Sequence, residues 1–349
     1  MNIKEAIASA NETFDNPKVN LCPHFVGQPG IGKSKSIEQM ARQRAKEAGL
    51  EFYSGPENYD KEKYGFIDIR LSQLEAADLT GIPVPTKDMF GNTTVKYTES
   101  PFLPKEGQGI LFIDEFAQAD KTMFALSSQL IYDKRVGVHK VGDGWDIIAA
   151  SNRASDKSIS SKLPQMIKDR LIKMPIDFDL KGFIEHLHDI NAPEEAIAYA
   201  KYQPGDLQSF DPNKEDNCTP RSFTEASMFL SAPQDLKMHL ISGCIGEGYA
   251  AKLLGFAKIW KELPSPEEIV EDPKTAKVPD KADVQFATVS MLAFRVVEDT
   301  FSKMMEYVKR LPDREYQTLF VKSALEKQPQ LADTDAFNNF LSENVSVLV

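Results

Sequence analysis

The stretch GQPGIGKS, Gly27–Ser34, has the residue types and spacing of a loop that holds phosphate, G-x-x-x-x-G-K-[ST]. Glycines let backbone N–H groups turn inward around an anion, and a helix beginning near Lys33 points its positive end at that anion. Lys33 offers a charge to the β- and γ-phosphates, and the Ser34 hydroxyl is a ligand for Mg²⁺. A chance glycine turn would not explain why Lys33 and Ser34 fall in register between a strand and a helix. The residues expected to contact the nucleotide here are Gly27, Gln28, Pro29, Gly30, Ile31, Gly32, Lys33, Ser34 and Lys35.

An acidic pair, Asp114 and Glu115, follows directly after an apolar run at 110–113. An aspartate at such a strand end holds Mg²⁺, directly or through water. The adjacent Glu115 can polarise the attacking water as a general base. A solvated strand end is the plain alternative, but two acids after this run and downstream of a phosphate loop are more specific. Small GTPases would show an NKxD motif, which is not found, and nucleotide kinases as a rule lack this pair. The pair favours an NTPase that hydrolyses with a glutamate base.

A polar residue after the fourth predicted strand, Asn152, would sit beside the phosphate loop and bond the γ-phosphate or the attacking water. The alternative is an ordinary asparagine turn.

Arg170 stands just before the fifth predicted strand. In a ring of subunits this position faces the neighbour's nucleotide, so Arg170 is the candidate arginine finger. The alternative is an ion pair with Asp169.

A second arginine, Arg221, falls in the first turn of a predicted helix, after Pro220. From there it would report the nucleotide's state to a helical domain, within one subunit or between two; the alternative is a plain surface arginine. Arg153, beside Asn152, is a weaker candidate than Arg170 for a contact between subunits.

The elements that must position these residues follow from hydrophobic periodicity. Strands alternate with helices in the first half, which indicates an α/β domain with a mostly parallel sheet. The pattern predicts helices over 3–13 and 35–49, the latter closed by Gly49, and strands over 23–26, 65–71, 109–116, 145–152 and 171–178.

After about residue 180 the pattern becomes helical. Segments 203–220 and 264–284 are rich in proline or charge and are expected to be loops, and two or three helices are expected over 285–349. No internal repeat interrupts this organisation. The chain therefore divides into an α/β part followed by an all-α part.

Composition limits the class of protein. The chain has 349 residues, 42% of them hydrophobic and 27% charged, as in ordinary globular proteins. Its net charge of −11 argues against a general nucleic-acid or membrane binder. Three cysteines without metal-like spacing fit a reducing compartment, and no run is long enough for a signal peptide or a membrane span. We expect a cytoplasmic protein.

Taken together, these motifs resemble those of AAA+ ATPases. Two stretches, IRLSQLEAADLTGIPVP (69–85) and QLIYDKRVGVHKVGDGWDIIAASNR (129–153), are similar to the MoxR type with its helix-2 insert. FDPNKEDNCTPRSF (210–223) and GEGYAAKLLGFAKIWKELPSP resemble the sensor 2 loop and lid of a bacterial MoxR-like branch. The resemblance covers roughly 18–268. It departs modestly in a polar first strand and in Phe116, where many relatives have Ile or Leu.

The resemblance implies a P-loop NTPase core with a five-stranded parallel sheet of order 5-1-4-3-2, an all-α lid and a C-terminal helical extension. The domains would be 1–178, 179–268 and 269–349. ATP and Mg²⁺ would be the cofactors. Hairpins at 83–100, with its turn at 90–92, and near 135–145 would line the pore of a hexamer, or serve the fold alone.

The resemblance also implies a partner. MoxR-type proteins commonly remodel a protein client, in several cases one with a von Willebrand factor A domain.

A small basic patch is expected to be a solvated face rather than a nucleic-acid track; it comprises Lys134, Arg135, His139 and Lys140.

The leading hypothesis is thus an ATP-driven motor that remodels or assembles a protein partner. A nucleic-acid motor, such as a helicase or loader, is the alternative, although the acidic charge counts against it. A nucleotide-gated scaffold that scarcely hydrolyses ATP is a third class, and Glu115 argues against it. A small-molecule kinase is the weakest option, because nothing resembles an acceptor site.

Overall fold

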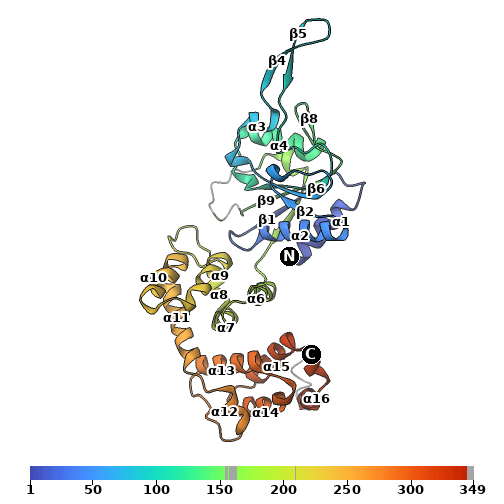
Figure 1. Cartoon of the computed structure of the whole chain (residues 1–349). Helices are drawn as coiled ribbons and strands as arrows, with labels where there is room; N and C mark the ends of the chain where they lie inside the picture. The colour runs from blue at the N-terminus through green and yellow to red at the C-terminus, as the bar shows by residue number, and fades with distance from the viewer. Residues whose placement is uncertain (154–155, 157–162, 209, 344–349) are drawn as a thin grey trace. The chain divides into compact units, whose positions relative to one another are not determined.

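The computed structural model describes residues 1–153, 156, 163–208 and 210–343, and the chain divides into two compact units (Figure 1). Unit 1 contains Met1–Asp179 together with Phe210–Glu215 and Thr219–Arg221. Unit 2 contains the rest of the described chain from Leu180 onward.

Unit 1 is built on a six-stranded parallel sheet with the order β10-β1-β9-β6-β3-β2. The predicted α/β class with a parallel sheet is confirmed, and so is the order of the five predicted strands. The predicted number of strands was wrong, because a sixth strand lies at the edge beside β3. This strand has three residues, too few to show a periodicity. The strands are β1 (Cys22–Gly27), β2 (Phe52–Ser54), β3 (Tyr64–Arg70), β6 (Gln108–Asp114), β9 (Gly144–Ser151) and β10 (Leu171–Ile176).

The central strand β6 shows why the apolar run at 110–113 predicts burial on both faces. Ile110 and Phe112 pack into one hydrophobic core with helices α1 (Ile3–Phe14) and α2 (Lys33–Glu47). Leu111 and Ile113 point the other way, into a core shared with α3 (Ala76–Thr80) and α4 (Lys121–Asp133). Figure 1 shows these helix pairs on opposite faces of the sheet. Alternate residues therefore leave both faces apolar, as a covered parallel strand requires.

Local signals fix the helices that flank the sheet. Asn2 and Glu5 form a reciprocal capping box at the start of α1. Helix α2 begins at Lys33, immediately after Gly32, and ends before Gly49, whose φ is +68°. Among the described residues of unit 1, the remaining short helices are η1 (Pro56–Asn58), η2 (Leu71–Gln73), η3 (Phe116–Gln118) and α5 (Gln165–Lys168).

Both predicted hairpins are present. Strands β4 (Pro83–Lys87) and β5 (Thr93–Tyr97) form a two-stranded antiparallel arm that extends away from the sheet of unit 1 (Figure 1). Its turn contains Gly91 with a φ of +82°. Strands β7 (Arg135–Val136) and β8 (His139–Lys140) form a second, much shorter hairpin before β9.

Unit 2 is helical, with a hydrophobic core of its own over residues 269–340. Two predictions were wrong here. The segments 203–220 and 264–284 are not loops throughout, because each contains a short helix that begins at a proline. Four α-helices, rather than two or three helices, follow residue 281 in the described chain, together with the short 3₁₀ helix η6. The helices are α6 (Leu180–Asp189), α7 (Glu194–Tyr202), α8 (Pro204–Gln208), α9 (Pro220–Met228), η5 (Phe229–Ser231), α10 (Gln234–Ile245), α11 (Glu247–Lys261), α12 (Pro266–Glu271), α13 (Ala282–Arg295), α14 (Glu298–Val308), α15 (Glu315–Lys327), η6 (Pro329–Asp333) and α16 (Asp335–Glu343).

Across the described residues, no helix combines the length and apolar character needed to span a bilayer.

Candidate nucleotide site

The predicted phosphate loop connects β1 to α2. Gly30 and Gly32 have φ values of +75° and +97°, which only glycine adopts without strain. A Cβ on Gly30 would also lie 2.6 Å from the Thr219 hydroxyl oxygen. The Gly30 carbonyl accepts a hydrogen bond from the backbone N–H of Arg221 at 3.1 Å. The segment at 219–221 thus closes over the loop and leaves no room for a side chain.

Lys33, the first residue of α2, folds back over the loop. Its Nζ donates to the carbonyls of Gly27 and Gln28 at 2.8 and 2.9 Å, and to Oδ1 of Asn152 at 3.1 Å. The amine is buried. Lys33 therefore joins the loop to the residue that follows β9, as the parallel topology predicts for neighbouring strand ends.

Burial lowers the pKa of Lys33 from its ordinary value to about 8. The carboxylates of Asp114 and Asp156 oppose this shift, whereas the positive charges of Arg221 and Arg153 add to it. A buried ammonium group among two arginines is a setting that an anion would stabilise. The charges near Lys33 therefore fit a phosphate group.

Ser34 and Asp114, the two residues predicted to bind Mg²⁺, are in contact. The Ser34 hydroxyl donates to Oδ2 of Asp114 at 2.8 Å, across 80 residues of chain. The other carboxylate oxygen, Oδ1, accepts the backbone N–H of Glu115 at 2.8 Å. A hydroxyl and a carboxylate at one point form the hard-oxygen set that Mg²⁺ prefers.

Glu115 adopts the left-handed conformation, with φ +51° and ψ +32°. For a residue with a Cβ this costs about 1 kcal/mol or more, and such strain clusters at functional sites. Its Oε2 accepts a hydrogen bond from the Ser72 hydroxyl at 3.2 Å. Ser72 lies in η2, directly after β3, the sheet neighbour of β6. Sequence reasoning missed Ser72, and the only available signal was a polar side chain after the second predicted strand.

His24 is a second residue that the sequence analysis missed. It lies buried in β1, where its Nε2 is 2.8 Å from the Ser151 hydroxyl and its ring packs edge-on against Phe116. Burial first, and then the charges of Lys173 and Lys33, lower its pKa to about 3. His24 is therefore neutral at physiological pH. Its contact with Ser151 holds the end of β9, just before Asn152.

Arg153 lies beside the phosphate loop of its own chain. Its guanidinium reaches Oδ2 of Asp156 at 3.3 Å and Oε1 of Gln28 at 3.3 Å. Gln28 is buried, and its Nε2 has no hydrogen-bond partner in the described structure. The loop thus holds a buried donor that a ligand oxygen would satisfy.

Arg170, the candidate arginine finger, is anchored to α4 of its own chain. Its Nη1 donates to the carbonyl and hydroxyl of Ser128 at 2.8 and 2.7 Å, and its guanidinium lies 4.6 Å from the centre of the Tyr132 ring. It forms no ion pair with Asp169, which instead accepts from Gln165. Arg170 is outside the cluster around Lys33.

The remaining predicted loop contacts differ in exposure. Ile31 is buried in the hydrophobic core that includes residues of α1 and α2, so its side chain anchors the loop to that core. Lys35 is exposed and Pro29 is partly exposed.

Of the predicted basic patch, Arg135 and Lys140 are exposed, Lys134 is partly buried and His139 is buried. Lys134 donates to the Trp145 carbonyl, and His139 is buried with its Nε2 3.0 Å from the Thr80 carbonyl. Lys140 pairs with Asp143 at 2.9 Å. The patch therefore does not form a continuous basic track.

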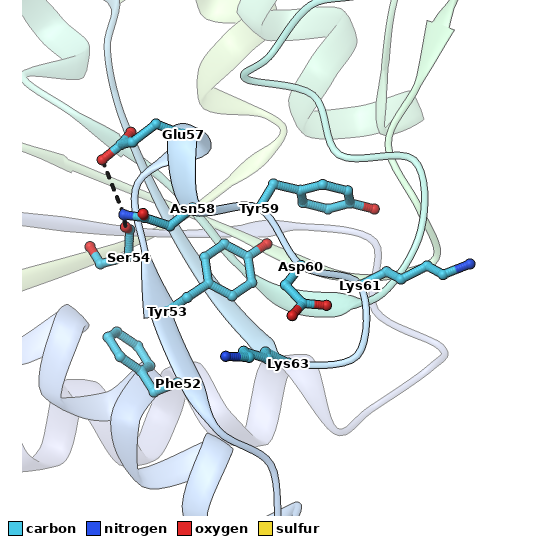
Figure 2. A pocket seen from close by; sticks show the side chains of 9 residues that line it. All are labelled: Phe52, Tyr53, Ser54, Glu57, Asn58, Tyr59, Asp60, Lys61 and Lys63. Carbon is cyan, nitrogen blue, oxygen red and sulfur yellow. Dashed lines mark hydrogen bonds between the residues drawn. The ribbon is translucent and has the colours of Figure 1, made fainter.

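A pocket at the sheet edge lies apart from this site (Figure 2). It is lined by residues of β2 and the loop that follows, between Phe52 and Lys63. Because Phe52 pairs with Tyr64, the first residue of β3, the pocket adjoins the beginnings of the strands, whereas Asp114 and Asn152 lie at their ends. None of the predicted site residues lines it.

Comparison with known proteins adds little beyond the fold. No family model matches the chain, and no curated protein matches it. Similar solved structures include a proline-to-glycine mutant of RuvB from Thermotoga maritima, with 17% identity, 91% of this chain and 94% of that chain covered, and a TM-score of 0.40. DnaA of Aquifex aeolicus bound to AMPPCP has 14% identity, 99% and 94% coverage and a TM-score of 0.34. NtrX of Brucella abortus with ADP has 12% identity, 97% and 68% coverage and a TM-score of 0.36. Likenesses this distant carry no weight for function.

Proposed function

We propose that this chain is an AAA+ ATPase of the MoxR type that hydrolyses ATP with Mg²⁺ and uses the energy to remodel a protein partner. The observation that carries the proposal is the contact between Ser34 and Asp114, which joins the start of α2 to the end of β6 beside a glycine loop. The adjacent Glu115 and the nearby Asn152 complete the set that such hydrolysis requires.

Each residue has a distinct task in this proposal. Lys33 exchanges its loop carbonyls for the β- and γ-phosphates, and Asn152 orients the terminal phosphate or the attacking water. Glu115 accepts a proton from that water. Mg²⁺, held by Ser34 and Asp114, would neutralise charge on the phosphates.

A shared site explains the arginines. Arg221 would bind nucleotide at the loop against which its backbone packs, and Arg170 would serve the site of a neighbouring subunit. This requires a closed ring of heterologous contacts, which we propose to be a hexamer. Residues 179–268 would be the lid and 269–349 a helical extension. The client would be a protein, with a von Willebrand factor A domain as one candidate class.

The test is capture of a client by Glu115→Gln in the presence of ATP. This variant keeps Lys33, Ser34 and Asp114, so it should bind ATP without hydrolysing it and retain its client. Lys33→Ala, which should not bind ATP, is the matched control. Enrichment of the same protein with Glu115→Gln over Lys33→Ala supports the proposal. Recovery of DNA and no protein would favour the nucleic-acid motor, and full cellular function of Glu115→Gln would favour a scaffold.

A further inference from the structure

The β4–β5 arm is a two-stranded hairpin without cover in the described structure. All five residues of β5 and four of the five in β4 are exposed. At the tip, Met89 and Phe90 are 90% and 81% exposed. An isolated two-stranded hairpin is marginally stable in water, and a third strand or a packed face is what usually stabilises it.

The hydrogen-bonding pattern of the arm distinguishes its two outer edges. The Thr98 N–H donates to the Ile82 carbonyl at 3.0 Å, near the base. The Asp88 N–H donates to the Asn92 carbonyl at 3.0 Å, at the turn. Bonded and non-bonded pairs alternate along an antiparallel ladder. The pairs whose main-chain groups point away from the ladder are therefore Pro83–Tyr97, Pro85–Val95 and Lys87–Thr93.

The outer edge of β4 is blocked and that of β5 is open. Pro83 and Pro85 have no N–H, so β4 lacks donors at two of its three outward positions. On β5 the outward positions are Thr93, Val95 and Tyr97, and each has an N–H and a carbonyl that no described residue bonds. Prolines are a common means of protecting an edge strand from pairing. Only one edge of the arm carries this protection.

The side chains along the open edge add an apolar face and positive charge. Val95 and Tyr97 are 57% and 45% exposed and lie on the face that also carries Pro83 and Pro85. The two strands contain Lys87 and Lys96 and no acidic residue, although the whole chain has a net charge of −11. Lys96 lies in β5 on the face opposite Val95 and Tyr97, whereas Lys87 lies in β4, one strand further from the open edge. An incoming strand would therefore be favoured by apolar side chains on one face and a carboxylate toward Lys96 on the other.

The arm is also ordered at both ends. At the tip, the Asp88 carboxylate accepts the N–H groups of Phe90 and Asn92 at 2.9 Å each. At the base, Gly81 has a φ of +74° and lies so close to the Thr98 carbonyl that a Cβ would clash with it. A preformed edge costs less entropy to bind than a flexible one.

We propose that the outer edge of β5 binds an extended segment of a protein partner as a third strand, with main-chain bonds to Thr93, Val95 and Tyr97. The segment is apolar on the side facing Val95 and Tyr97 and carries an acidic residue toward Lys96 on its other side. The inference takes from the proposed function only that the partner is a protein. Binding at this edge requires no nucleotide.

The test is fluorescence anisotropy of a fluorescein-labelled peptide of alternating valine and threonine residues with one glutamate, titrated with the full chain. The control peptide has the same sequence with alternate amides N-methylated, which removes its main-chain donors. Val95→Pro removes an outward N–H while leaving the hairpin's own bonds, and should weaken binding by about tenfold or more. Val95→Thr keeps the N–H and should retain most of the affinity. Slow amide exchange at Thr94 and Lys96 verifies that the hairpin is intact.

Tight binding of the first peptide, loss with the methylated peptide and loss in Val95→Pro support the proposal. No binding of the first peptide, equal binding of both peptides, or undiminished binding by Val95→Pro overturns it, as does binding of an oligo-dT strand in place of the peptide. Phosphate release measured on the same samples separates the two proposals. A chain that binds the peptide but releases no phosphate refutes the ATPase alone.

Discussion

At the scale of single residues, the site depends on a few hydrogen bonds between strand ends. Lys33 joins the loop to Asn152, Ser34 joins α2 to Asp114, and Ser72 reaches Glu115. Each of these contacts connects residues more than forty positions apart in the sequence. Their formation depends on the parallel sheet, whose strand ends meet at one edge.

Ser72 is predicted to position Glu115. In Ser72→Ala the glutamate carboxylate loses its hydroxyl donor, and we expect kcat to fall by roughly fivefold to tenfold because orientation is lost. KM for ATP should stay unchanged, since Ser72 is not among the loop contacts. Ser72→Thr, which keeps the hydroxyl, should restore the rate. Steady-state kinetics of the three proteins provide the measurement, and an unchanged or raised kcat in Ser72→Ala would show that the contact does not assist hydrolysis.

His24 should make stability depend on acid. Its pKa is about 3 in the folded chain against the ordinary value of 6.5, so between these values the unfolded chain binds a proton that the folded chain does not. This contribution to stability is complete above pH 6.5 and declines as the pH falls, by about 1.4 kcal/mol per pH unit. Urea unfolding between roughly pH 4 and pH 7 should show this extra slope in the wild type relative to His24→Gln. If the free energy of unfolding changes with pH equally in the two proteins, the pKa of His24 is not lowered in the folded chain.

At the scale of elements, strands with long apolar patterns could be predicted from the sequence. Five strands and their order follow from apolar runs such as 110–113 and from the resemblance. Strand β2 was missed because Phe52–Ser54 is too short for a periodicity, and α8 and α12 were missed because proline- and charge-rich segments resemble loops.

The site shows the same division. Motif spacing identified Lys33, Ser34 and Asp114, and the structure brings them together; their roles remain predictions. Ser72 and His24 belong to no motif, and only the sheet register reveals what they contact. The anchoring of Arg170 on Ser128 was equally invisible, because those residues are 42 positions apart.

The phosphate loop should not tolerate a side chain at Gly30. In Gly30→Ala the new methyl group would meet Thr219 at a position whose φ is already +75°. We expect a loss of about 1–3 kcal/mol in stability and weaker ADP binding. Gly255→Ala in α11, where nothing lies within 4 Å of the added Cβ, is the matched control and should stabilise the chain by about 0.5–1 kcal/mol. Thermal unfolding with and without ADP would measure both the stability and the ADP binding of each variant. If Gly30→Ala behaved like Gly255→Ala, the close approach of Thr219 to Gly30 would be contradicted.

At the scale of the whole molecule, the proposed ring makes hydrolysis a property of two subunits. Arg170→Ala subunits keep Glu115, and Glu115→Gln subunits keep Arg170. In an equal mixture, half the sites have an intact base and half of those face an intact arginine, so about a quarter of wild-type activity should return. Each variant alone should be nearly inactive. If the mixture stays as inactive as its components after subunit exchange, the site is not shared through Arg170.

The most direct test of the central claim is phosphate release by the purified chain with ATP and Mg²⁺. The wild type should release phosphate continuously. Glu115→Gln should release it at least about 100-fold more slowly, since a general base contributes on that order. Glu115→Gln should still bind labelled ATP as tightly as the wild type. Absence of release by the wild type, or equal release by Glu115→Gln, would contradict the assignment of this site as an ATPase with a glutamate base.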